Sequence, residues 1–414
     1  MKMLERLLYY IICLYVVILP ITEKLTVKGR NIPVADSFLA VVFILYILKL
    51  ILFPTSRKNF IHGIKDFFTS YLSIFMFLFL IVMFFSVNYA VEKKLAISES
   101  FRFLTYIILY FIIKYEYNPK DYIKGIINSY FFTAVIVSMI GIYGYFSGFK
   151  TVLVYGVKRT SSTLDNPNNL AAFLMLIIFP IIMVIFNERD KVKKAIYSIG
   201  FLLVFCSLIL TFSRNSLVGL AIGILILLML YSWKLIFAVG PLGLILLFIP
   251  KINHRIMDLT NATQNQSRIK LWKTALKMIE EHPIFGVGNG NFVSLYNTYV
   301  KKYPELEYPD YKRFPCHNSY LKVESELGIM GGFLFLAILI SVPLRIKKLL
   351  ETSKDKFYKS FFKGFLISTI VFYIMNISDN LFFVPKTTTY FWLMLACCEA
   401  IIFEQKSKKG GDYY

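Results

Sequence analysis

Long apolar runs recur from one end of the sequence to the other, and they constrain the fold more than any other feature. Stretches such as "LSIFMFLFLIVMFFSV" and "LAAFLMLIIFPIIMVIF" contain no charged residue. A helix needs about 20 apolar residues to cross the roughly 30 Å hydrocarbon core of a bilayer. Because 57% of the 414 residues are hydrophobic and only 17% are charged, little sequence is left for an ordinary soluble domain. The chain is therefore predicted to be an all-α polytopic membrane protein.

About twelve membrane spans are predicted, all within a single transmembrane domain that covers residues 1–414. They cover residues 6–22, 33–53, 69–88, 95–114, 123–147, 169–187, 194–212, 216–233, 235–250, 318–344, 360–379 and 388–404. The first run lacks the small-residue cleavage site of a signal peptide, so we interpret it as an uncleaved span.

The formal charge of +21 follows from the predicted topology. Lys and Arg concentrate in alternate short loops, including 57–65, 189–194 and 345–363, and in the tail at 406–409. This positive-inside pattern puts both termini in the cytoplasm. We therefore expect membrane lipids, and no nucleic acid, as partners. The five cysteines form no CxxC pair, so no metal site is expected.

Residues 251–317 form a predicted large extracytoplasmic loop between spans nine and ten. Its middle, "QSRIKLWKTALKMIEEHPIFGVGNGNF", predicts an amphipathic helix from about Ser267 to Glu281 that rests in the outer interface or packs on the bundle. The predicted apolar face consists of Ile269, Trp272, Leu276 and Ile279. The "GVGNGN" run follows a helix and no strand, so a nucleotide-binding fingerprint is rejected.

Two polar clusters fall on the predicted outer side, before this loop. "KRTSSTLDNPNNLAAF" contains Arg159 and Asn168; it could equally be a solvated loop in which Asn168 or Asn169 caps the next helix. "TFSRNS" places Arg214 in a short connection, where an arginine could also anchor helix ends to lipid headgroups.

Two more clusters lie in and after the loop. Arg268 opens the amphipathic helix, where it could also be an ordinary interfacial arginine. "HNSYLKVESELGIMGG" begins with His317, which could also be a surface or cap residue, and Asn318 or Ser319 can cap the following helix. Carboxylates inside a span must face water or a partner, so Glu324 and Glu326 are interpreted as functional.

A further pair, Glu99 and Arg102, is spaced i,i+3 within span four. We interpret it as a structural ion pair, with cavity lining as the alternative.

Together these residues predict arginines and one histidine around a cavity in the outer leaflet. Guanidinium groups stay charged and bind phosphate oxygens in a bidentate manner. Histidine can accept a proton from an attacking hydroxyl. The sequence contains no Walker loop, no DxD-type metal site and no Ser-His-Asp order. The chemistry that fits is metal-free displacement of a phosphate leaving group at the outer membrane face.

The motifs between residues 159 and 332, in this order and spacing, resemble the O-antigen ligase and O-antigen polymerase superfamily. The resemblance implies a GT-C-like glycosyltransferase of the bacterial inner membrane, without a cofactor, whose active site faces the periplasm. It implies an undecaprenyl-diphosphate-linked glycan as donor. The acceptor is lipid A-core in ligases and another lipid-linked repeat in polymerases, and the sequence leaves that choice open.

The resemblance also implies roles for individual residues. His317 corresponds to the base, and Arg214 and Arg268 correspond to the arginines that hold the diphosphate. Arg159 and Asn168 fall in a further family-like motif, in which Arg159 is expected to add to the diphosphate site. We expect a metal-independent, inverting displacement, with Glu324, Asn318 and Asn168 as supporting residues.

Two rival functions are considered. A transporter or flippase of lipid-linked glycans could use the arginines as a transit site, but we see no internal repeat and the mid-chain connection at 188–193 is short. A lipid II-polymerising peptidoglycan glycosyltransferase would rely on an acidic residue of the outer loop, and the "HN" motif fits that class poorly. The acidic residues available to it are Asp258, Glu305, Glu307 and Asp310.

Overall fold

The computed structural model describes residues 2–22, 24–27, 30–117, 122–154, 156–231, 262–308 and 313–409, together with 237, 253 and 257. Within them, nine helices are long and apolar enough to cross a membrane. They are α1 (Lys2–Ile21), α2 (Val34–Leu52), α4 (Tyr71–Phe85) with its extension η1 (Ser86–Asn88), α5 (Lys93–Glu116), α6 (Lys124–Ser147), α7 (Pro167–Asn187), α8 (Lys191–Leu210), α14 (Ser319–Thr352) and α15 (Lys356–Met375). The prediction of a multi-pass, all-α membrane protein is confirmed.

Two further predicted spans are also helical. Residues 216–233 correspond to the shorter apolar helix α9 (Arg214–Leu230), and residues 388–404 lie inside α16 (Pro385–Lys409). The predicted span at 235–250 falls almost wholly outside the described residues. The count of twelve therefore stays a prediction.

Several short elements were not predicted from the sequence. They are the helices α3 (Pro54–Phe67), α13 (Phe292–Lys302), η5 (Pro304–Leu306) and η6 (Leu381–Phe383), and the antiparallel hairpins β1 (Lys24–Val27)–β2 (Arg30–Pro33) and β3 (Thr151–Val154)–β4 (Val157–Thr160). In the second hairpin Val154 pairs with Val157 and Thr151 with Thr160. Each hairpin lies in a predicted outer loop, where apolar periodicity gives no signal.

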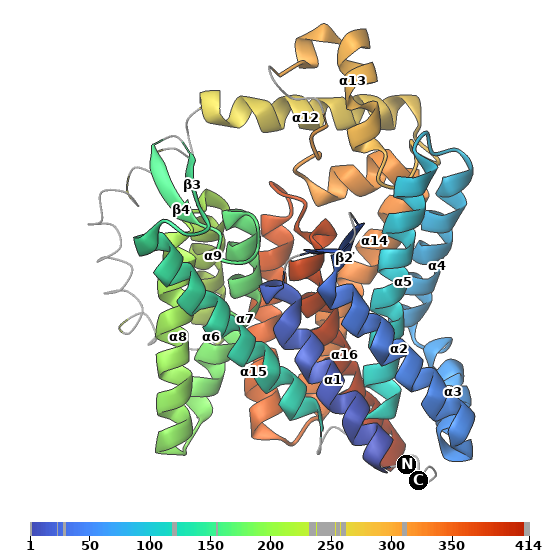
Figure 1. The fold of residues 1–414 in the computed structure, drawn as a ribbon, viewed down its shortest axis with the longest axis vertical. Helices are drawn as coiled ribbons and strands as arrows, with labels where there is room; N and C mark the ends of the chain where they lie inside the picture. The colour runs from blue at the N-terminus through green and yellow to red at the C-terminus, as the bar shows by residue number, and fades with distance from the viewer. Residues whose placement is uncertain are drawn as a thin grey trace.

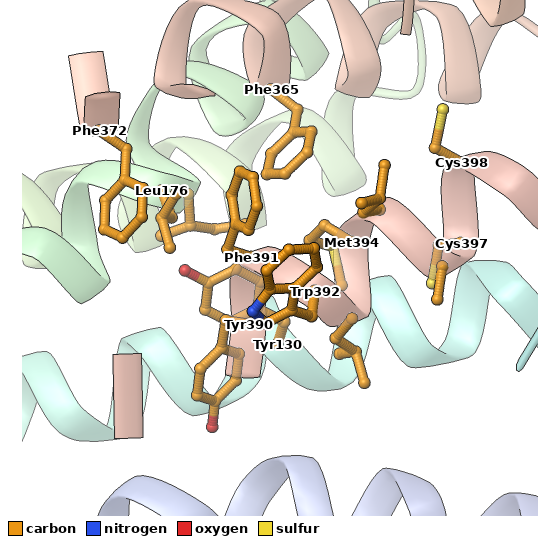
Figure 2. Packing of buried hydrophobic residues seen from close by; sticks show 14 of the residues in the cluster. Tyr130, Leu176, Phe365, Phe372, Tyr390, Phe391, Trp392, Met394, Cys397 and Cys398 are labelled. Carbon is orange, nitrogen blue, oxygen red and sulfur yellow. The ribbon is translucent and has the colours of Figure 1, made fainter. Parts of the chain in front are cut away.

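The helix α7 lies inside the bundle, and 78% of the residues in its apolar stretch are buried. It packs along α15, where a Cβ on Gly364 would collide with the backbone of Phe179 and Pro180. A glycine at this contact lets the two helix backbones approach closely. Around the neighbouring α16, Figure 2 shows Tyr390 and Phe391 among aromatic rings from other helices. This core fixes the helix ends that carry the polar residues described below.

Charged side chains inside the bundle are paired. Glu399 of α16 is fully buried and accepts hydrogen bonds from Arg345, and its Oε2 lies 3.2 Å from Lys114 Nζ. Lys114 Nζ also lies 3.0 Å from Asp66 Oδ2. A buried charge that lost its partner would be strongly destabilising, so this cluster joins α3, α5, α14 and α16 as one unit.

The two termini lie together at one end of the bundle, and α12 (Ala262–Glu281) and α13 lie across the other end (Figure 1). The end of α12 at Glu281 is as predicted, and its start precedes the predicted Ser267. Two residues of the expected apolar face, Ile269 and Leu276, are 44% and 46% exposed, so they do not pack on the bundle, and the predicted placement in the outer interface stays a prediction. The buried face is instead formed by Leu271, Ala275 and Met278. These residues belong to a separate small core that α12 shares with α13, η5 and Cys316.

The helix α14 does not run straight into the bundle, because it breaks at Gly328 (φ 64°, ψ −167°). The segment after α12 fits into this break. Ile329 N–H donates to Pro283 O at 2.9 Å, while Val287 N–H and Gly288 N–H donate to the carbonyls of Ser325 and Glu326. The backbone groups freed by the break are thus satisfied by the loop. The first three turns of α14, which carry the unusual charges, are therefore separated from the apolar part of the helix.

The "GVGNGN" run is a structural wedge between α14 and the α4–α5 connection. Gly288 has φ 104°, and a Cβ there would come within 2.7 Å of Ala90 Cα. Asn289 Nδ2 donates to Ser100 Oγ at 3.1 Å, and Glu326 accepts from Gly290 N–H at 2.8 Å. Both the positive φ and the close approach require glycine.

Candidate functional site

The histidine that the sequence singled out forms a pair with an aspartate that it did not. His317 Nδ1 lies 3.1 Å from Asp379 Oδ1, although the two residues are 62 positions apart. Asp379 lies in the connection between α15 and η6, and the predicted span at 360–379 had placed it at a helix end. His317 is in the left-handed region, with φ 53°. Such a conformation is uncommon for a residue other than glycine and often marks a functional position.

Asn168 connects Asp379 to the first two polar clusters. Its Nδ2 donates to Asp379 Oδ2 at 3.0 Å. Its Oδ1 accepts from Arg159 Nη2 at 2.7 Å and from Ser213 Oγ at 2.9 Å. Because two donors hold the oxygen, the amide orientation is fixed, and its nitrogen must face the carboxylate.

Asn168 is available for this role because it does not cap α7. The N-cap is Asn166, whose side chain accepts from Asn168 N–H at 2.7 Å, and Pro167 occupies the first helical position. Proline favours that position because its missing N–H has no partner there in any helix. The predicted cap at Asn168 or Asn169 is therefore wrong, and the cap lies at Asn166.

Arg159, predicted to bind a diphosphate, is buried on β4 and holds protein groups together. Its Nε donates to Thr211 O at 2.8 Å, in the turn that precedes α9. With its bond to Asn168, the guanidinium joins the β3–β4 hairpin, the start of α7 and the α8–α9 turn. The structure thus gives Arg159 a positioning contact.

The two other predicted arginines lie on helices whose residues contact this network. Arg214 is the first residue of α9, directly after Ser213, so it stands at a helix N-terminus that favours anions. Arg268 lies on α12, and its positive charge acts on the carboxylate of Asp379. The structure therefore brings His317 and Asn168 into contact with Asp379 and joins Arg159 to it through Asn168. The charge of Arg268 acts on the same carboxylate, and Arg214 follows Ser213 in the chain.

Backbone contacts hold the connection that carries Asp379. Asn376 accepts from Ser319 N–H on its carbonyl at 2.9 Å and from Ser319 Oγ on its amide oxygen at 2.6 Å. Asn215 Nδ2 donates to Met375 O at 2.8 Å. The starts of α9 and α14 are thus tied to the end of α15.

The backbone of His317 is also held by a residue of α12. Trp272 Nε1 donates to His317 O at 3.1 Å, so α12 contacts the site through this side chain. Asn318 is the N-cap of α14, as predicted, and accepts from Tyr320 N–H and Leu321 N–H. The ring of His317 keeps 24% of its surface exposed. Its backbone is fixed while its ring remains accessible.

The electrostatics of the pair favour an ionised aspartate. Burial raises the pKa of Asp379, but the hydrogen bond and charge of His317, the charge of Arg268 and the Asn380 N–H outweigh it and lower that pKa below its usual range. An ionised carboxylate can only accept, so Nδ1 of a neutral His317 carries the proton and Nε2 is left with a lone pair. This tautomer can act as a base through Nε2.

The predicted carboxylates of α14 have other places. Glu326 is buried; it pairs with Lys322 and accepts from Gly290 N–H and Phe292 N–H, so it holds the glycine loop. Glu324 is half-buried, and the partner of His317 Nδ1 is Asp379 instead. The proposed support of His317 by Glu324 is therefore replaced by Asp379.

The Glu99 and Arg102 side chains do pair, at 3.1 Å. They also line a small cavity of roughly 30 Å³ between α4, α5, α14 and η6. Both interpretations of this pair, structural ion pair and cavity lining, are thus compatible with its position.

The fold and the site together define a multi-pass membrane protein with an aspartate–histidine pair and arginines near the points where several helices begin or end. The segment that carries three of these residues also matches a known family: residues 199–336 match the family model described as O-antigen ligase. This match, over a third of the chain, supports the resemblance to the O-antigen ligase and polymerase superfamily that the motifs indicated. No curated protein matches the chain. At the level of the family, the match implies a membrane enzyme of the glycosyltransferase type.

Proposed function

We propose that the protein transfers a glycan from undecaprenyl diphosphate to a hydroxyl of an envelope glycan acceptor. The observation that carries this proposal is the His317–Asp379 pair, joined through Asn168 to the cluster that ends beside Arg214. A base next to fixed positive charges suits a reaction in which a hydroxyl attacks and a diphosphate leaves. The family match supports the same class of reaction.

In the proposed mechanism, His317 Nε2 takes the proton of the acceptor hydroxyl as its oxygen attacks the anomeric carbon. The bond between that carbon and the diphosphate oxygen breaks, and the configuration of the carbon inverts. Asp379 stabilises the imidazolium that forms. A positioned base of this kind contributes about 10²–10⁴-fold to the rate.

Arg214 and Arg268 stabilise the departing diphosphate, whose negative charge grows in the transition state. The start of α9 adds the positive end of a helix dipole beside Arg214. Arg159 acts through Asn168 and Asp379 as a positioning residue. All of these groups belong to the protein, so the proposed step requires no metal.

The proposed site faces the periplasmic side of the inner membrane. It lies toward the end of the bundle opposite the two termini, near α12 and α13 (Figure 1). The positively charged predicted loops place the termini in the cytoplasm. The donor glycan would therefore be reached from the outer leaflet.

The test is His317→Asn in purified protein, assayed for transfer from a lipid-linked donor in detergent. Asparagine tolerates the left-handed backbone of His317 (φ 53°) but cannot act as a base. We expect transfer to fall by about 10²–10⁴-fold, with donor binding and melting temperature close to wild type. Normal transfer by this variant would overturn the base assignment. Wild-type protein that joins no donor to acceptor in detergent would favour the transporter alternative.

A further inference from the structure

Asn380, next to Asp379, is a buried amide whose hydrogen bonds are not made within the protein. The residue is 7% exposed, and neither Nδ2 nor Oδ1 has a partner among the described residues. Among the described residues, Asn380 is the one side chain with two buried polar atoms that lack a hydrogen-bond partner. Buried polar atoms are almost always paired, so a pair of orphan atoms requires an explanation.

The neighbouring amides make the contrast clear. Asn168 uses both side-chain atoms on Asp379, Arg159 and Ser213. Asn376 donates to Phe372 O and accepts from Ser319 Oγ. The local fold thus provides hydrogen-bond partners for the amide side chains of Asn168 and Asn376, which have structural roles, but not for that of Asn380.

The backbone of Asn380 is held although its side chain is not. Its N–H donates to Asp379 Oδ1 at 2.9 Å, and its carbonyl accepts from Phe383 N–H at 3.0 Å. It is the N-cap of η6, yet its side chain makes no capping bond. The amide is therefore presented by a fixed backbone beside the His317–Asp379 pair.

The chemistry of an amide selects the kind of group that it can bind. Nδ2 donates and Oδ1 accepts, so a full match needs a group that does both. A phosphate offers only acceptors and would leave Oδ1 unsatisfied. A sugar hydroxyl offers one donor and two lone pairs, and it matches both atoms of the amide.

We propose that Asn380 binds a hydroxyl of the sugar that is attached directly to the diphosphate of the donor. This inference rests on the proposed function, because it takes the diphosphate to lie between Arg214 and Arg268. The positive charge of Arg268 acts on the carboxylate of Asp379, and Asn380 is the next residue in the chain. The first sugar is the hydroxyl-bearing group closest to a diphosphate held there, so Asn380 is assigned to sugar recognition.

The experiment compares the binding of two kinds of probe to purified protein in detergent. One probe is a short-chain polyprenyl diphosphate, and the others carry one glucose, galactose or N-acetylglucosamine on that diphosphate. Dissociation constants are measured for wild type, for Asn380→Leu, which keeps the size of the side chain but removes both polar atoms, and for Asn380→Ser in case the leucine variant does not fold. Thr369→Val is the matched control, since Thr369 is also buried with an unpartnered hydroxyl, on α15.

We expect wild type to bind at least one sugar-bearing probe more tightly than the bare diphosphate. Asn380→Leu and Asn380→Ser should lose this increment, which corresponds to about five- to fifty-fold for one or two hydrogen bonds, and keep the affinity for the bare probe. Thr369→Val should change neither. A folded variant at Asn380 that keeps the full increment, or a wild type without one, would overturn the inference. Failure of wild type to bind the bare probe would instead contradict the proposed diphosphate site.

Discussion

Replacing Asp379 with asparagine removes the negative charge of this side chain and leaves its size almost unchanged. The carboxylate accepts from three donors: His317 Nδ1 at 3.1 Å and Asn380 N–H at 2.9 Å on Oδ1, and Asn168 Nδ2 at 3.0 Å on Oδ2. Arg159 and Ser213 hold the oxygen of Asn168, so that amide cannot turn to accept instead. An asparagine has only one accepting atom and cannot serve both sides.

Either orientation of the new amide loses one hydrogen bond. If its nitrogen faces His317, the imidazole must accept on Nδ1 and the proton moves to Nε2, which can then no longer act as the base. If its oxygen faces His317, the tautomer is kept but two NH₂ groups meet at Asn168, and the imidazolium loses its negative partner. A positioned base contributes about 10²–10⁴-fold, and we expect Asp379→Asn to lose about 10²–10³ of it, or about 2.7–4 kcal/mol in the barrier.

The assay is the initial rate of transfer by purified protein, with melting temperature measured in parallel. One unsatisfied buried donor should cost about 1–3 kcal/mol of stability. The control is Asp165→Asn, because Asp165 is likewise a paired aspartate, at 3.5 Å from Lys386, and has a positive φ that asparagine accepts, but its side chain is 68% exposed. It should stay within about 1 kcal/mol of wild type, as exposed ion pairs do. A folded Asp379→Asn protein with a transfer rate close to wild type would refute the reasoning.

The effect of Asp379→Asn on stability should also depend on pH. The pKa of Asp379 is lowered below its usual value of 3.8 in the folded protein, so its ionised form stabilises the fold above that pH. The contribution is lost as pH falls through the lowered folded pKa. The stability difference between wild type and Asp379→Asn should therefore shrink as pH falls below about 4. A difference that grew as pH fell below about 4 would contradict the assigned direction.

Three further substitutions test other parts of the site. Arg214→Lys keeps the charge at the start of α9 but loses bidentate contact with phosphate oxygens, so donor affinity should fall by about tenfold or more, measured with the bare diphosphate probe; unchanged affinity and turnover would count against the clamp. Gly328→Ala should lower stability by about 1–3 kcal/mol, because an L-residue is strained at this φ and ψ and its Cβ would meet the backbone of Ile284; Gly332→Ala, whose Cβ would make only ordinary contacts with Glu324, is the control. Asn166→Ala should lower the free energy of unfolding by about 1 kcal/mol, because α7 loses its N-cap. It should also slow transfer, because the backbone of Asn168 is no longer held by that cap. A loss of stability with an unchanged transfer rate would show that the cap does not position the site.

The membrane helices were predictable because each depends on its own composition. A run of about 20 apolar residues is a local signal, and no distant partner is needed to interpret it. The break in α14 was not predictable in the same way. Gly328 occurs in an ordinary helical pattern, and only the loop at 283–288 shows why the helix opens there. The buried face of α12 was missed for a related reason, because Leu271 and Met278 pack with residues of α13, which the sequence pattern did not reveal.

The candidate site was predictable up to the residues that belong to motifs. Short polar stretches between apolar runs contain His317, Arg214 and Arg268. Such stretches can be recognised from local sequence alone. Asp379 was missed because the predicted span at 360–379 absorbed it at its end. The run "NISDN" at 376–380 carried the available signal, since four of its five residues are polar and do not continue an apolar helix. That Asp379 is the partner of His317, and Glu324 is not, depends on the packing of α15 against α14 and α9.

The large loop has a structural consequence for the proposed chemistry. Trp272 holds the carbonyl of His317, and Arg268 lies one helical turn before Trp272 on the same side of α12. Cys316, adjacent to His317, is buried in the small core that α12 shares with α13. The proposed base and one half of the proposed diphosphate clamp are therefore attached to a single unit. A displacement of α12 that moved Arg268 away from Asp379 would also pull on the backbone of His317, so the loop couples the position of the leaving group to that of the base.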